Sequence, residues 1–111
     1  MKMLDDAAKL AAETKHNEKH FLLGCIAERQ DGVLVKSTNA EVRTPEASGH
    51  AEARSLRKAG FGATLWVARV LRDGSWAMAK PCKNCKALIK NKGVKKVYYT
   101  TGPNSWESWN P

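Results

Sequence analysis

The stretch Pro81-Cys82-Lys83-Asn84-Cys85, together with His50-Ala51-Glu52 earlier in the chain, decides how this sequence of 111 residues is interpreted. The two stretches offer a metal ion two thiolates and one imidazole, and they leave a carboxylate beside these groups. A hydrolytic zinc site needs this set: three protein ligands, an open fourth position for water, and a base. We therefore predict one Zn2+ per chain. Its ligands are His50, Cys82 and Cys85, and the base is Glu52.

Both stretches are typical of the start of a helix. Pro81 suits the first helical position, where its missing N–H costs nothing, so we predict a helix over residues 81–92 that ends at Gly93. A shorter helix is predicted over residues 50–59, with Gly60 as its cap. The free amides and positive dipole end of a helix favour the thiolate forms of both cysteines. If the two helices lie on one face of a sheet, their N-termini converge and a metal ion bridges them.

The remaining pattern indicates a single α/β domain over residues 1–111. Apolar residues recur at three- and four-residue spacing over residues 2–15, which predicts an amphipathic helix. Strands are predicted at residues 21–27, 33–35, 63–71 and 94–101, with room for another at 105–111. Asp31-Gly32 and Asp73-Gly74 are turn signals, and residues 36–49 have the composition of a long loop. The predicted fold is a three-layer α/β/α sandwich with a mixed central sheet, and the direction of a strand after Gly102 stays open.

Composition excludes several classes of protein. No apolar run approaches the roughly 18 residues of a membrane span, and the N-terminus lacks the hydrophobic segment of a signal peptide. Three cysteines in such a chain argue against a disulfide framework, and Cys25, in an apolar stretch, is predicted to be a core residue. We expect a cytoplasmic protein that does not bind membranes.

The net charge of +8 is unevenly distributed. Seven lysines and no acidic residue lie between residues 80 and 96. Such a stretch attracts phosphate-bearing partners, but it is equally typical of a solvated surface. Five aromatic residues leave a similar choice, because each could stack on a base or close the core: Trp76, Tyr98, Tyr99, Trp106 and Trp109.

The pair of motifs H-A-E and P-C-x-x-C resembles the zinc-dependent cytidine and deoxycytidylate deaminase superfamily. The resemblance implies that water attacks the carbon bearing the exocyclic amine and that Glu52 carries protons to the ring and to the leaving ammonia. It also implies that Asn39 binds the sugar or base and that the Ala51 amide contacts the pyrimidine carbonyl. Members of the superfamily commonly form homo-oligomers, which we also expect here. This chain departs from many of them because only about ten residues follow the fourth long strand.

We therefore expect a zinc-dependent hydrolytic deaminase of a cytosine nucleoside or nucleotide, with deoxycytidine monophosphate or a relative as substrate. One alternative is deamination of cytosine or adenosine within single-stranded DNA or RNA, which the lysine stretch favours. Another is a non-catalytic nucleic-acid-binding module stabilised by zinc. An intact Glu52 argues against that module, because a purely structural site needs no carboxylate there, and such sites are usually closed by a fourth Cys or His.

Overall fold

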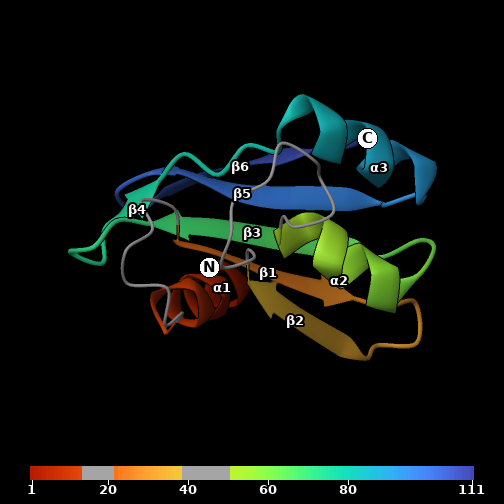
Figure 1. Cartoon of the computed structure of the whole chain (residues 1–111), viewed down its shortest axis with the longest axis horizontal. Coiled ribbons are helices and arrows are strands. Elements are labelled where there is room, and N and C mark those ends of the chain that lie inside the picture. Colours follow the sequence, from red (N-terminus) through yellow and green to blue (C-terminus); the bar gives the residue numbers. More distant parts are fainter. Residues whose placement is uncertain (14–21, 39–50) are drawn as a thin grey trace.

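A mixed sheet forms the centre of the protein in a computed structural model that describes residues 1–13, 22–38 and 51–111. Its strand order is β2-β1-β3-β5-β6, and the short β4 pairs with the end of β3. In chain order the elements are α1 (Lys2–Ala12), β1 (Leu22–Glu28), β2 (Leu34–Thr38), α2 (Ala51–Ala59), β3 (Thr64–Val70), β4 (Trp76–Ala77), α3 (Lys83–Asn91), β5 (Lys96–Gly102) and β6 (Ser105–Trp109). Figure 1 shows the strands side by side with the helices packed against them.

Tight turns join the antiparallel neighbours, as the Asp-Gly signals predict. At the first turn Gly32 has φ +88°, and the Arg29 N–H donates to the Val33 carbonyl at 2.8 Å. The Asp31 carboxylate accepts a hydrogen bond from the Val33 N–H at 3.2 Å, which fixes the same turn. Gly74 has the same φ of +88°, and β4 pairs back antiparallel to β3. The hairpin predicted at Asp31-Gly32 is thus confirmed, and after Asp73-Gly74, where the sequence leaves pairing or loop open, the chain pairs back briefly.

The one parallel pairing in the described sheet joins β3 to β5, with α3 in the connection between them. The chain then reverses at Asn104, which has φ 55°, and β6 runs antiparallel to β5. The direction of the last strand, which the sequence left open, is therefore antiparallel. The central sheet is mixed, as expected.

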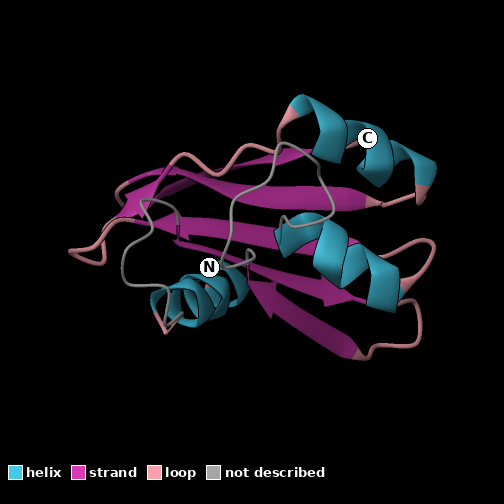
Figure 2. Cartoon of the chain, in the orientation of Figure 1, coloured by secondary structure: helices cyan, strands magenta, loops and turns pink. Residues whose placement is uncertain are grey.

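Alternation along β3 divides the core into two layers, one on each face of the sheet. Leu65 and Val67 point to the cluster that contains residues of α2 and α3, whereas Ala68 and Val70 point to the cluster that contains residues of α1. Helices therefore cover both faces, and the prediction of a three-layer α/β/α sandwich is confirmed (Figure 2).

Helix α1 lies directly on the backbone of β1. A Cβ atom at Gly24 would collide with the Ala7 carbonyl oxygen, so only glycine allows this approach. The helix ends at Ala12, which is shorter than the predicted 2–15, because Glu13 already makes the capping hydrogen bonds to Lys9 and Ala11. Within the described part of the chain, no helix has the length and apolarity needed to cross a bilayer.

Candidate active site

The two cysteines of the Pro-Cys-x-x-Cys motif lie at the start of α3. The helix begins at Lys83, two residues later than predicted, because Cys82 is its N-cap with extended backbone angles (φ −69°, ψ 169°). The Cys82 carbonyl accepts the first helical hydrogen bond, from the Lys86 N–H, at 2.8 Å. Cys82 is exposed and Cys85 is fully buried, yet the two thiols are hydrogen-bonded to each other. The motif thus brings two sulfur atoms together at one helix end.

The other half of the candidate site lies at the start of α2. Ala51 is its first residue and is fully buried, and Glu52 is only 4% exposed. Two contacts fix the rotation of this helix on the sheet: the Arg54 guanidinium donates to the Thr38 carbonyl of β2 at 2.8 Å, and the Ser55 hydroxyl donates to the Cys25 carbonyl of β1 at 3.4 Å. The helix therefore holds Glu52 on its inner side.

Glu52 lies close enough to two thiols to affect their ionisation. The pKa of the Cys85 thiol is raised, first by its burial and second by the negative charge of Glu52. The same two causes, in the same order, raise the pKa of Cys25. The expectation that the helix end favours the thiolate of Cys85 is therefore wrong for the metal-free chain, because Cys85 lies inside the first turn, out of water and beside a carboxylate.

Helices α2 and α3 pack on the same face of the sheet, which confirms the predicted arrangement. Leu56 and Ala59 of α2 and Ile89 of α3 share one apolar cluster with the inward residues of β3 and β5. Because Glu52 acts on Cys85 electrostatically, the starts of the two helices are also near each other. The structure thus brings together three of the predicted groups: Glu52, Cys82 and Cys85.

Two predicted site residues, His50 and Asn39, lie outside the described residues. Among residues 1–13, 22–38 and 51–111, no three His, Cys, Asp or Glu side chains are grouped as ligands for a metal ion. The donors that are described nevertheless suit zinc, since two adjacent sulfur atoms are soft ligands of the kind that zinc prefers over magnesium or calcium. The predicted third ligand is His50.

Sequence reasoning missed the layer beneath Glu52. Cys25 of β1 was identified only as a core residue, and Ser55 was not singled out. The signal for Ser55 was present, because it follows Glu52 by three positions and must share its face of a helix. The signal for Cys25 was absent, because its position under α2 depends on how that helix packs across the sheet.

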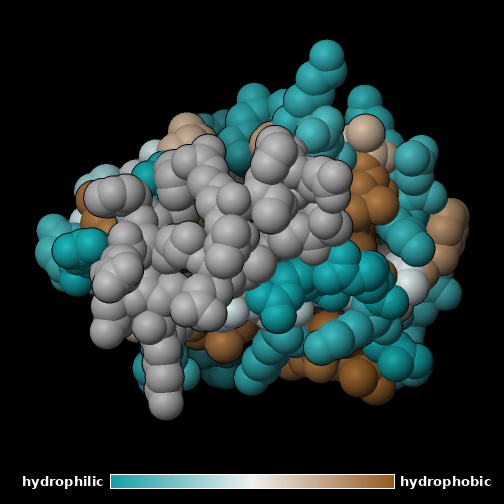
Figure 3. All heavy atoms as spheres, in the orientation of Figure 1, coloured by the Kyte–Doolittle hydropathy of each residue, from teal (hydrophilic) through white to brown (hydrophobic). Residues whose placement is uncertain are grey.

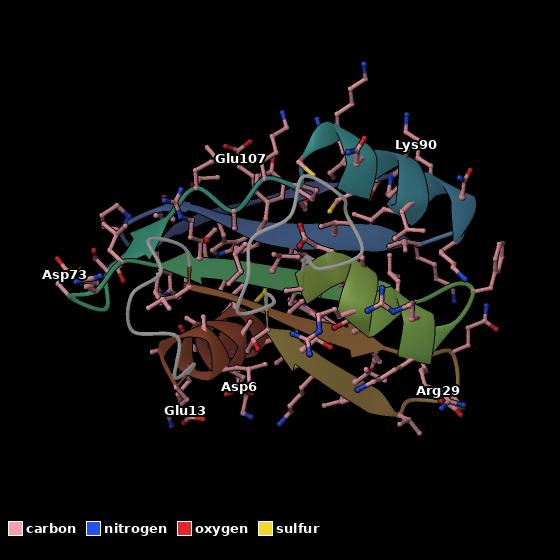
Figure 4. The ribbon with its side chains drawn as sticks, in the orientation of Figure 1. Asp6, Glu13, Arg29, Asp73, Lys90 and Glu107 are labelled. Atoms are coloured by element: carbon pink, nitrogen blue, oxygen red, sulfur yellow. The ribbon has the colours of Figure 1, made fainter. Side chains whose placement is uncertain are left out.

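Hydrophilic side chains cover the outer side of α2 (Figure 3), and several lysines lie on α3. Figure 4 shows Lys90 pointing from α3 away from the sheet. Lys83, directly after Cys82, is exposed, whereas Lys86 is half-buried with its Nζ 5.9 Å from the centre of the Trp109 ring. Lysines therefore lie next to the thiol pair.

The described part of the candidate site thus consists of two helix starts over one face of the sheet, a thiol pair at one of them and a buried carboxylate at the other. The chain belongs to the cytidine and deoxycytidylate deaminase zinc-binding region family, whose model matches residues 1–101. No curated protein matches the chain significantly.

Solved structures support the same fold. Cytidine deaminase from Mycobacterium leprae is 21% identical with a TM-score of 0.59, and the match covers 95% of this chain and 88% of that one. Cytidine deaminase from Mycobacterium tuberculosis is 24% identical with a TM-score of 0.54, covering 90% and 85%. RibD from Acinetobacter baumannii is 24% identical with a TM-score of 0.58, covering 90% of this chain but only 27% of RibD. The chain is thus similar in extent to the first two and to about a quarter of the third.

Proposed function

We propose that this protein is a zinc-dependent hydrolytic deaminase that converts a cytosine nucleoside or nucleotide, such as deoxycytidine monophosphate, to the uracil form with release of ammonia. The observation that carries the proposal is the buried carboxylate of Glu52 next to the Cys82 and Cys85 thiols at the start of the neighbouring helix. Membership of the deaminase family supports it.

One Zn2+ per chain, held by His50, Cys82 and Cys85, would supply a Lewis acid that lowers the pKa of water toward neutrality. Because Glu52 is not one of these ligands, its carboxylate can act as the proton carrier. Its carboxylate takes a proton from the attacking water and delivers it to the ring nitrogen next to the carbon under attack. It then takes the remaining proton from the added hydroxyl group and delivers it to the amino group, so that the C=O bond forms as the C–N bond breaks and ammonia leaves. The overall reaction consumes one water and gives one ammonia.

Burial suits Glu52 to this role. A carboxylate that is 4% exposed keeps its position without competition from bulk water, and a low-dielectric site strengthens its interaction with a proton donor. Beside it, Ala51 is the first described residue of α2, and its backbone N–H is proposed to contact the pyrimidine carbonyl. Asn39 is proposed to bind the sugar or base.

Deamination within single-stranded DNA or RNA is the second candidate. The lysine stretch from residue 80 to 96 favours it, because Lys83 is exposed directly beside the thiol pair and the stretch holds no acidic residue. A phosphate backbone crossing the site would meet this charge. A free nucleotide needs only one such contact.

A substrate panel tests the proposal. The zinc-loaded protein is incubated with cytidine, deoxycytidine, deoxycytidine monophosphate and a cytosine-containing oligonucleotide, and loss of the amino-bearing base is followed by ultraviolet absorbance. Turnover of the monomers but not of the oligonucleotide supports the proposal, and the reverse supports the second candidate. Absence of turnover on all four, with one zinc bound, would instead support a non-catalytic zinc-stabilised module. The homo-oligomer that we also propose is tested by sedimentation of the same sample.

A further inference from the structure

The face of the sheet opposite the candidate site carries three aromatic side chains on neighbouring strands: Trp66 of β3, Tyr98 of β5 and Trp106 of β6. We call this set the aromatic row. Val97 and Tyr99 point into the cluster shared with α2 and α3, so Tyr98 between them points to the other face. Trp66 lies beside Tyr98 in the parallel register of β3 and β5. The aromatic row is therefore separate from the residues proposed for deamination.

Helix α1 covers only part of this face. It packs mainly on β1 and β3, where Ala68 and Val70 are buried and Trp66 packs against the same cluster, and it makes only a minor contact with β5 (Figure 1). Trp66 and Tyr98 are consequently half-buried, and Trp106 is 42% exposed. The ring surface that α1 leaves uncovered, largest at Trp106, is available to a partner.

Trp66 and Tyr98 form an offset stacked pair, and Trp106 meets Tyr98 in an edge-to-face arrangement. The Trp66 and Tyr98 rings are parallel to within 6°, with centres 5.7 Å apart, and the Tyr98 and Trp106 rings meet at 60° with centres 5.8 Å apart. Separations of this size belong to offset and edge-to-face pairs, in which the rings overlap only in part. The aromatic row thus keeps ring surface for a further planar group.

Cationic and small polar residues surround the aromatic row. The Lys96 Nζ is 5.3 Å from the centre of the Tyr98 ring, and Thr64 is the register partner of Lys96. Register pairs also place Lys36, Ile26, Trp66, Tyr98 and Ser108 in one line across the sheet, from β2 to β6. Four strand spacings of about 4.8 Å give this line a length of about 19 Å.

From these observations we propose that the aromatic row binds single-stranded nucleic acid, with bases stacked on Trp66, Tyr98 and Trp106 and phosphates contacted by Lys96. Aromatic rings interspersed with lysines match the alternating planar bases and negative phosphates of a single strand. The three rings lie on three neighbouring strands, two strand spacings or about 10 Å across, which suits two or three bases. The chain's net charge of +8 favours binding of a polyanion. One acidic residue of the sheet, Glu28, lies on the same face, two strands from Lys96.

Binding of a fluorescein-labelled oligothymidylate of about 12 nucleotides, measured by fluorescence anisotropy at about 50 mM and 200 mM salt, tests the proposal. This probe has no cytosine, so it cannot be deaminated. Binding should be the same for Glu52→Gln as for the parent protein, which keeps this test independent of the proposed function. The proposal is overturned if the parent protein does not bind the probe at the lower salt concentration.

Variants of the aromatic row should weaken binding by a defined amount. Trp106→Ala removes one stacking ring from an exposed position and should reduce affinity about 5- to 100-fold, whereas Trp106→Phe should stay within about 3-fold of the parent. Lys96→Gln should reduce both the affinity and its salt dependence, and Lys96→Arg should restore them. Circular dichroism and turnover of the free nucleotide check that each variant is folded.

Lys90→Gln is the matched control, because it removes the same charge from α3 on a side chain that points away from the sheet (Figure 4). An equal loss of affinity in Lys90→Gln and Lys96→Gln would assign binding to overall charge and overturn the proposal. Unchanged affinity in Trp106→Ala would overturn it as well. If sedimentation shows that Trp106→Ala dissociates an oligomer and leaves oligothymidylate affinity unchanged, the aromatic row is a surface between copies of this chain instead.

Discussion

Cys85 of α3 is buried beside Glu52 of α2, and burial first and the carboxylate's charge second raise the pKa of its thiol. Two residues that are 33 positions apart in the sequence therefore share one electrostatic environment. In the metal-free protein this arrangement keeps Cys85 protonated at neutral pH. A divalent cation placed among these groups would reverse that preference, because it favours a thiolate and offsets the carboxylate.

Replacing Glu52 should stop turnover without removing the metal. Glu52→Gln keeps the shape of the side chain and abolishes its ability to accept a proton, so we expect kcat to fall about 10²- to 10⁴-fold. Steady-state kinetics and zinc analysis of the same sample make the measurement. Glu28→Gln, which removes an exposed carboxylate at the end of β1, is the control and should keep full activity. Equal activity of Glu52→Gln and the parent would contradict the assignment.

Zinc content should separate the ligand cysteines from the core cysteine. We expect one zinc per chain in the parent, a large loss in Cys82→Ser and in His50→Ala, and full zinc in Cys25→Ala, which removes a buried thiol that the proposed ligand set does not use. Metal analysis after dialysis gives the result. Chelation should also lower the midpoint of thermal unfolding, because bound metal stabilises the native state. Zinc loss in Cys25→Ala equal to that in Cys82→Ser would show that the ligand set is wrong.

Zinc binding should release protons and strengthen with pH. The Cys85 thiol carries a proton in the metal-free protein because its pKa is raised, and it carries none as a ligand, so higher pH favours the bound form. Apparent affinity should rise about tenfold per pH unit for each proton released. Calorimetry in buffers of different ionisation enthalpy counts these protons. An affinity that does not change between about pH 6 and pH 8 would contradict the protonated thiol.

The contact between α1 and β1 at Gly24 should have no room for an added methyl group. Gly24→Ala places a Cβ against the Ala7 carbonyl oxygen, so α1 must shift, and we expect a loss of about 1–3 kcal/mol in the free energy of unfolding. Urea denaturation monitored by circular dichroism measures this loss. Gly102→Ala is the control, since its Cβ would approach only the Ser105 side chain, at 3.3 Å. Equal stability of the two variants would mean that α1 packs less closely than the structure indicates.

Much of the fold follows from local sequence. Each Asp-Gly signal becomes a turn with a glycine at positive φ, and Gly60 and Gly93 follow the ends of α2 and α3 with φ +75° and +62°. These features depend on one or two residues and their neighbours, so a single sequence predicts them. The exact starts of helices depend on capping, which is why α3 begins at Lys83 and not at Pro81.

Local sequence does not decide which aromatic residues lie in the core and which lie on the surface. Tyr98 and Tyr99 are adjacent in sequence and equally suited to a core or a binding surface, but they lie on opposite faces of β5. Trp109 packs against the cluster shared with α2 and α3, while Trp106, on the same strand, lies in the aromatic row. A strand's alternation separates such residues, but only the packing of the helices decides which face becomes the core.

The sequence by itself determined the chemical groups of the H-A-E and P-C-x-x-C motifs and the order of these motifs along the chain. The ability of a residue to bind a metal ion or accept a proton depends on its type and spacing, which can be seen in the sequence. Only the tertiary structure decided that Glu52 is buried beside Cys85 and Cys25, and that Trp66, Tyr98 and Trp106 lie on the other face of the sheet, where α1 covers them only in part. The physical reason is that proximity and burial arise from contacts between elements distant in sequence. Those contacts exist only once α1, α2 and α3 have packed on the sheet.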